Sequence, residues 1–96
     1  MAERKALPPA DLRIALQSLH GWDLTNGKLH REFQFGDFTE AFGFMSRVAL
    51  LAERLNHHPE WCNVYGRVVI DLVTHDAGGI SLLDIEFART VNVFLG

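Results

Sequence analysis

The sequence predicts an α+β fold in which helices cover one face of a four-stranded antiparallel sheet. Two observations lead to this prediction. Segments of alternating apolar and polar residues occur in pairs around glycine turns, and segments with helical periodicity occur before, between and after these pairs. The expected order is therefore α-β-β-α-β-β-α, because a two-layer packing buries one face of every element. We expect one domain over residues 1–96.

The first helix and the first hairpin should occupy the first third of the chain. Apolar residues recur at helical spacing over residues 10–22, and Gly21 indicates where this helix ends. Asn26 and Gly27 then divide a hairpin over residues 22–35. This dipeptide is typical of a type I′ turn, because both of its positions need a positive φ.

The longest helix is expected over residues 37–57, with Asp37 and Glu40 in capping-box spacing. Its apolar residues form two stripes, which are Phe38, Phe42, Met45, Ala49 and Ala52 in one, and Phe44, Val48, Leu51 and Leu55 in the other. Two stripes are more than one sheet can cover, so part of this helix should be buried against another copy of the protein. Gly43 costs about 1 kcal/mol relative to alanine inside a helix, so we expect a backbone to approach closely there.

A second hairpin and a third helix complete the predicted fold. Residues 61–65 and 67–75 are rich in β-branched and aromatic residues and flank Gly66. Ser81 and Asp84 have the capping-box spacing that opens a helix, and helical periodicity follows to the end of the chain.

The composition excludes several classes of function. A net charge of −3 and the lack of any run of lysine or arginine argue against direct nucleic-acid binding. The single cysteine, Cys62, cannot form an internal disulfide or a cysteine-based zinc cluster. No segment has the length and apolar character of a membrane span, and the first residues lack the apolar core of a secretory signal. We therefore expect a cytoplasmic protein without membrane contact.

The candidate site is a histidine cluster around the end of the long helix. Glu53 lies four residues before His57, so the two side chains should share one helical face, where the carboxylate can orient the imidazole. Pro59 disfavours helical geometry at His58, so the helix should end at the histidine pair. His75 returns at the end of the second hairpin. The cluster predicts a small acid/base site made by a helix terminus and a strand terminus.

These residues also allow other interpretations. The helix dipole favours a charged histidine at a helix C-terminus, but it explains one histidine better than two. Three imidazoles could bind zinc, yet adjacent histidines lack the i, i+4 spacing that puts two ligands on one helical face, so we expect no metal. His20 and His30 are interpreted as surface or structural residues. Trp61 and Tyr65 could stack on a ligand ring or pack within the sheet, and the sequence leaves both open.

The sequence also resembles a known family. The pattern E-x-x-x-H-H-P-x-W-x-N-V-Y followed by T-H-D, from Glu53 to Asp76, and the run F-x-x-A-F-G-F-M-x-R-V-A-L, from Phe38 to Leu50, resemble pterin-4a-carbinolamine dehydratases. The resemblance covers most of the chain. It implies dehydration of 4a-hydroxytetrahydrobiopterin to quinonoid dihydropterin, which recycles the pterin after aromatic amino-acid hydroxylation. Histidine acid/base chemistry would suffice, without a metal or an organic cofactor.

The resemblance also implies the roles of individual residues. The catalytic set would be His57, His58 and His75, with Glu53 orienting His57. The pterin-contacting residues would be His57, His58, Pro59, Thr74, His75, Asp76 and Ala77, and we add Trp61 to the substrate-binding set because its ring could stack on the pterin. We expect His57 to handle the N5 proton and His58 or His75 the leaving hydroxyl, although the sequence does not fix which is acid and which is base. Two positions depart from relatives, because Asn56 replaces an acidic residue found in some and Ala77 a cysteine found in others.

Members of the family look like tetramers or dimers, so we expect a homotetramer first and a homodimer second. Animal relatives also act as dimerisation cofactors for a homeodomain transcription factor, so the long helix is a possible surface for a protein partner. A pterin-related role in another pathway, such as molybdopterin metabolism, is a further alternative. The complete histidine set favours the enzyme.

Overall fold

The computed structural model describes residues 4–95 and has the predicted order of helices and strands. The elements are α1 (Pro9–Leu16), β1 (Asp23–Thr25), β2 (Lys28–Gln34), α2 (Phe38–Leu55), β3 (Glu60–Val64), β4 (Arg67–Leu72), the 3₁₀ helix η1 (His75–Ala77) and α3 (Leu82–Phe94). The strands form one antiparallel sheet in the order β1-β2-β4-β3. The α+β prediction is therefore confirmed.

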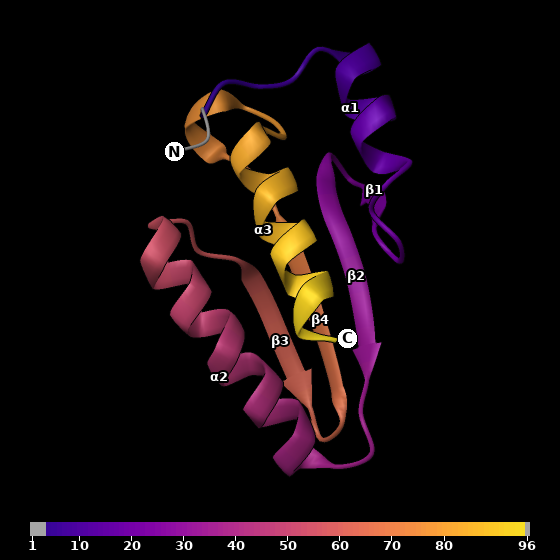
Figure 1. Cartoon of the computed structure of the whole chain (residues 1–96), viewed down its shortest axis with the longest axis vertical. Helices are drawn as coiled ribbons and strands as arrows, with labels where there is room; N and C mark the ends of the chain where they lie inside the picture. Colours follow the sequence, from indigo (N-terminus) through magenta and orange to yellow (C-terminus); the bar gives the residue numbers. More distant parts are fainter. Residues whose placement is uncertain (1–3, 96) are drawn as a thin grey trace.

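The sheet has one covered and one open face. Alternate residues of the central strands, such as Phe33 and Ile70, are buried with residues of α2 and α3 in a single core. These two helices cross the same face of the sheet, whereas α1 lies near one end of β2 (Figure 1). The residues between them, such as Glu32 and Arg67, point to the open face and pair there across strands. The alternation in the sequence predicted this division.

The turns and caps follow the local sequence signals. Asn26 and Gly27 both have positive φ, 52° and 76°, as a type I′ turn requires. The side chain of Asp37 accepts from the backbone N–H of Glu40 at the start of α2, and a full capping box opens α3. The Glu40 carboxylate accepts from Gly36 instead of Asp37, so the box at α2 is only half formed.

The first helix is shorter than predicted. α1 ends at Leu16, and residues 17–22 continue in tight turns with hydrogen bonds between residues three apart. These turns bring Leu19 and Trp22 into the core, with exposures of 2% and 4%. The periodicity of the sequence continues through this segment, but burial of the two side chains decides its conformation.

The two stripes of α2 have different environments. The stripe that includes Phe44 and Val48 packs in the core, whereas Phe38 and Phe42 of the other stripe are about half exposed, at 49% and 56%. A Cβ on Gly43 would meet nothing within 4 Å among the described residues. The close backbone approach predicted at Gly43 is therefore not found within residues 4–95.

Candidate active site

The predicted site lies where the C-terminal end of α2, the loop after β4 and the start of α3 meet at one end of the molecule (Figure 1). Asn56 caps α2 in a left-handed conformation with φ of 50°, so the chain leaves the helix just before the histidine pair. His57 consequently points inward and is 6% exposed, whereas the His58 side chain is 57% exposed. The cap separates the two neighbouring imidazoles into a buried and a solvent-exposed one.

A buried carboxylate holds His57. Its Nε2 lies 2.5 Å from Oδ1 of Asp84, which is completely buried in the first turn of α3. The second oxygen, Oδ2, accepts from Oγ1 of Thr74 at 2.7 Å and from the backbone N–H of Ser81 at 2.9 Å. A carboxylate fixed by two donors cannot rotate freely, so it also fixes the plane of the imidazole.

This arrangement leaves one nitrogen of His57 free. Because a carboxylate only accepts, the proton of a neutral His57 ring sits on Nε2, and Nδ1 keeps its lone pair. Nδ1 has no hydrogen-bond partner within residues 4–95. Every fully buried side-chain nitrogen or oxygen atom described there does have a partner, so Nδ1 is not fully buried. Nδ1 therefore retains some exposure, and the His57 residue lines the pocket described below. An imidazole in this state can accept a proton.

The partner of Glu53 differs from the prediction. Its carboxylate is 2.5 Å from Nε2 of His58, and both side chains are largely exposed. The i, i+4 spacing assumed that His57 continues the helix, but the left-handed residue Asn56 ends it first. Glu53 therefore contacts His58 and not His57, whose carboxylate partner is Asp84.

The third histidine, in η1, pairs with a carboxylate at the edge of the sheet. Nε2 of His75 is 3.0 Å from the carboxylate of Glu60 at the start of β3, which also accepts from Nζ of Lys28 on β2. The hydrogen bond from Lys28 holds the pKa of Glu60 below its ordinary value, so Glu60 stays charged beside His75. Each of the three predicted histidines thus has a different carboxylate partner.

The three histidines line one pocket of about 260 Å³. The other residues that line it are Arg4, Asn56, Val73, Thr74 and Asp76. Of the predicted pterin-contacting residues, Pro59, Trp61 and Ala77 are not among these. Trp61 instead lies beside Phe42, Met45 and Ala49 of α2. Within residues 4–95, no three His, Cys, Asp or Glu side chains gather as a ligand set for a metal ion.

Comparison with known proteins identifies the family. Residues 5–94 match the family described as pterin 4 alpha carbinolamine dehydratase. The chain belongs to this family. A protein of Solibacter usitatus that carries the provisional name pterin-4-alpha-carbinolamine dehydratase is 55% identical over 90% of both chains. A Synechococcus protein with the same provisional name is 51% identical over 90% of this chain and 92% of its own.

Two solved structures share the dehydratase fold. A crystal structure described as a transcriptional coactivator/pterin dehydratase from Brucella melitensis is 45% identical, with a TM-score of 0.91 over 96% of this chain and all of that one. A pterin dehydratase-like protein described as a RuBisCO assembly factor in the α-carboxysome is 25% identical, with a TM-score of 0.69 over 80% of this chain and 92% of that one. The fold is therefore shared with proteins described as enzymes and as assembly or regulatory factors.

Sequence reasoning missed three residues of this dehydratase-family site. Asp84 was interpreted only as a helix cap, although the same carboxylate holds a histidine 27 positions away. Glu60 was not linked to His75, and the N-terminal Arg4 was not linked to the site at all. Glu60 pairs with Asp71 in the sheet, four residues before His75, and nothing local in the sequence indicates the contacts of Asp84 and Arg4.

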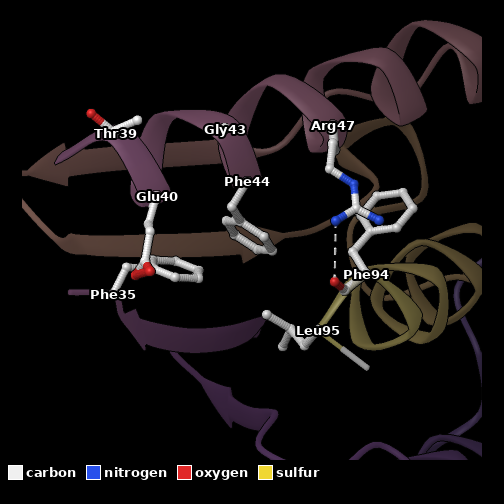
Figure 2. A pocket seen from close by; sticks show the side chains of 8 residues that line it. All are labelled: Phe35, Thr39, Glu40, Gly43, Phe44, Arg47, Phe94 and Leu95. Carbon is white, nitrogen blue, oxygen red and sulfur yellow. Dashed lines mark hydrogen bonds between the residues drawn. The ribbon is translucent and has the colours of Figure 1, made fainter. Parts of the chain in front are cut away.

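A larger cavity lies between the start of α2 and the end of α3, away from the histidines (Figure 2). It measures about 450 Å³ and is lined by Phe35, Thr39, Glu40, Gly43, Phe44, Arg47, Phe94 and Leu95. The guanidinium of Arg47 lies over the Phe94 ring and donates to the Phe94 carbonyl. No histidine among residues 4–95 lines this cavity, so the smaller pocket is the candidate for acid/base chemistry. Among residues 4–95, no helix has the length and apolar character to cross a membrane.

Proposed function

We propose that the chain dehydrates 4a-hydroxytetrahydropterins to quinonoid dihydropterins by histidine acid/base catalysis. Membership of the dehydratase family supports this proposal. The observation that carries it is the pocket in which three histidines, each hydrogen-bonded to a separate carboxylate, face the same space. A bicyclic pterin ring is small enough for this pocket, which lies just below the usual range of about 300–1,000 Å³ for ligand pockets.

The reaction breaks two bonds and forms one double bond. The C4a–O bond breaks as an acid protonates the departing hydroxyl, which leaves as water. A base removes the N5 proton, and the freed electron pair forms the N5=C4a bond of the quinonoid product. Each positioned proton carrier contributes typically 10²- to 10⁴-fold.

We assign the N5 proton to His57 and the leaving hydroxyl to His58 or His75. His57 is suited to the base, because its Nε2 is held by Asp84 and its Nδ1 lone pair is free and not fully buried. His58 and His75 are exposed enough to exchange protons with water between turnovers. No metal ion or organic cofactor enters this scheme. In this proposal the whole chain acts as one domain in the cytoplasm.

The physiological role follows from the same chemistry. We propose that the enzyme returns the oxidised pterin of an aromatic amino-acid hydroxylase to its recycling route. If purified enzyme dehydrates the carbinolamine but the host makes no such hydroxylase, the pterin would come from another pathway.

We also propose that the exposed stripe of α2 joins copies of the chain, as a tetramer or otherwise a dimer. The rings of Phe38 and Phe42 lie side by side, tilted by 35° with centroids 5.7 Å apart, and both side chains are about half exposed. Exposed aromatic pairs of this kind are typical of protein interfaces. The same exposed stripe of α2 could bind a different protein instead of another copy of the chain. The oligomeric state therefore has to be measured before a different protein partner is sought.

The test is the decay of freshly generated 4a-hydroxytetrahydropterin, followed by absorbance in stopped flow. Wild type should accelerate the decay over buffer, with and without a chelator, and His57→Ala should lose most of the acceleration. The surface variant His20→Ala is the matched control and should keep it. Decay at the buffer rate with wild type would refute the enzymatic proposal, and loss of activity with chelator would refute the metal-free scheme.

A further inference from the structure

Arg4 forms a wall of the histidine pocket, although it comes from the opposite end of the sequence. Its Nη2 donates to the backbone carbonyl of Asn56 at 2.7 Å and approaches that of Leu55 at 3.5 Å. These are carbonyls at the C-terminal end of α2, where the helix dipole favours a cation. The guanidinium is thereby docked beside the histidine pair and lines the same pocket.

The segment that carries Arg4 is held in place at two further points. The backbone N–H of Leu7 donates to the carbonyl of Ile80 at 2.7 Å, and Ala6 forms an isolated antiparallel bridge with Ser81. Ser81 also donates its backbone N–H to Asp84, the carboxylate that holds His57. The N-terminal segment and the catalytic histidine are therefore anchored to the same turn.

Arg4 has donors to spare. A guanidinium carries five N–H groups. Both contacts of Arg4 with the end of α2 use Nη2, which leaves Nε and Nη1 without a partner among the described residues. Among the described residues that line the pocket, Arg4 is the only arginine or lysine. Asp76, on the same pocket, is an acceptor. The pocket therefore offers a permanent donor and a permanent acceptor beside its histidines.

We infer that Arg4 is a substrate-binding residue that donates a hydrogen bond to the 4-oxo oxygen of the pterin. This inference rests on the proposed function. The pyrimidinone edge of a pterin presents that oxygen as an acceptor next to N–H donors at N3 and the 2-amino group. Arg4 matches the acceptor and Asp76 matches the donors. The pairing selects 4-oxo pteridines over 4-amino pteridines, which present a donor to Arg4 and lack the N3 proton.

The test measures binding of two pteridines to wild type and Arg4→Met by calorimetry at pH 7.5. The probes are 7,8-dihydropterin and 2,4-diamino-7,8-dihydropteridine, which differ at C4 and in the N3 proton. Wild type should prefer the 4-oxo compound, and Arg4→Met should reduce this preference by about tenfold or more, the value of one hydrogen bond to a charged group. In the dehydration assay, KM should rise more than kcat falls, because the contact exists before the reaction.

Lys5→Met is the matched control, because it removes the same charge one residue along the segment from an exposed side chain. It should leave the preference unchanged. If Arg4→Met weakened both pteridines equally, Arg4 would serve only to hold the end of α2, and the inference would be wrong. If wild type bound both compounds equally, it would also be wrong. If wild type bound neither compound and did not accelerate dehydration, the proposed function would fail with it.

Discussion

Replacing Asp84 with asparagine should disable His57 without removing it. The asparagine oxygen can still accept from Thr74 and the backbone N–H of Ser81, the two donors that hold Oδ2. The amide nitrogen then faces Nε2 of His57 in place of Oδ1. An amide N–H is a donor, so the imidazole must accept at Nε2 and carry its proton on Nδ1. The free lone pair on Nδ1 would be lost.

The structure sets the expected size of the two effects. Loss of a positioned general base lowers kcat by about 10²- to 10⁴-fold. Three hydrogen bonds lose their charged acceptor, each worth about 1 kcal/mol more than a neutral bond, and relief of the buried charge offsets part of this. We therefore expect a stability loss of about 1–3 kcal/mol, small enough to leave the protein folded at 25 °C.

The assay combines stopped-flow dehydration with urea unfolding of the same preparations. Glu86→Gln is the matched control, because Glu86 is an exposed carboxylate two residues along α3. It should change neither kcat nor stability appreciably. A folded Asp84→Asn variant with wild-type kcat would show that the orientation of His57 does not depend on the buried carboxylate.

Three further predictions concern stability and assembly. Gly21→Ala should lower the free energy of unfolding in urea by about 1–3 kcal/mol more than Gly27→Ala. Both glycines have positive φ, but only a Cβ at Gly21 would meet a side chain, 2.5 Å from Cζ of Arg31, and the guanidinium would have to leave its hydrogen bonds to the His20 carbonyl and Asn92. Equal losses would contradict this. His30 has a pKa raised above 6.5 by its hydrogen bond to Asp71, so its contribution is complete below pH 6.5 and is lost as the pH rises through the raised pKa. Wild type should lose up to about 1 kcal/mol relative to His30→Gln over that interval in urea titrations, and identical pH profiles would argue against the contribution. Phe42→Glu should lower the molar mass measured by light scattering to that of one chain, and an unchanged mass would exclude the α2 stripe as the interface.

Local sequence signals predicted most of the fold. The Asn26 and Gly27 turn and the Ser81 and Asp84 capping box formed as expected, because each depends on neighbouring residues. The first helix did not follow its periodicity, because Trp22 is drawn into the core by packing, where its Nε1 donates to Asn92, 70 positions away. The residue at which the first helix ends could therefore not be predicted from the neighbouring sequence.

In the candidate site, too, features set by neighbouring residues could be predicted and features set by long-range contacts could not. The three histidines and their common pocket could be predicted, partly from the resemblance to the family. The carboxylate partner of His57 could not be predicted, because the left-handed residue Asn56 changes the direction of the chain. As a result Glu53 contacts His58 and not His57. The contacts of Arg4 and Asp84 join residues 52 and 27 positions apart, and only the assembled fold reveals them.

We propose that His57 and Asp84 act as one unit in proton transfer. A double-mutant cycle of His57→Ala and Asp84→Asn, with kcat for dehydration as the readout, tests it most directly. The double variant should be no slower than His57→Ala alone, because a carboxylate that works through an imidazole has no further effect once the imidazole is gone. Losses that multiply in the double variant would contradict it, since Asp84 would then contribute independently of His57.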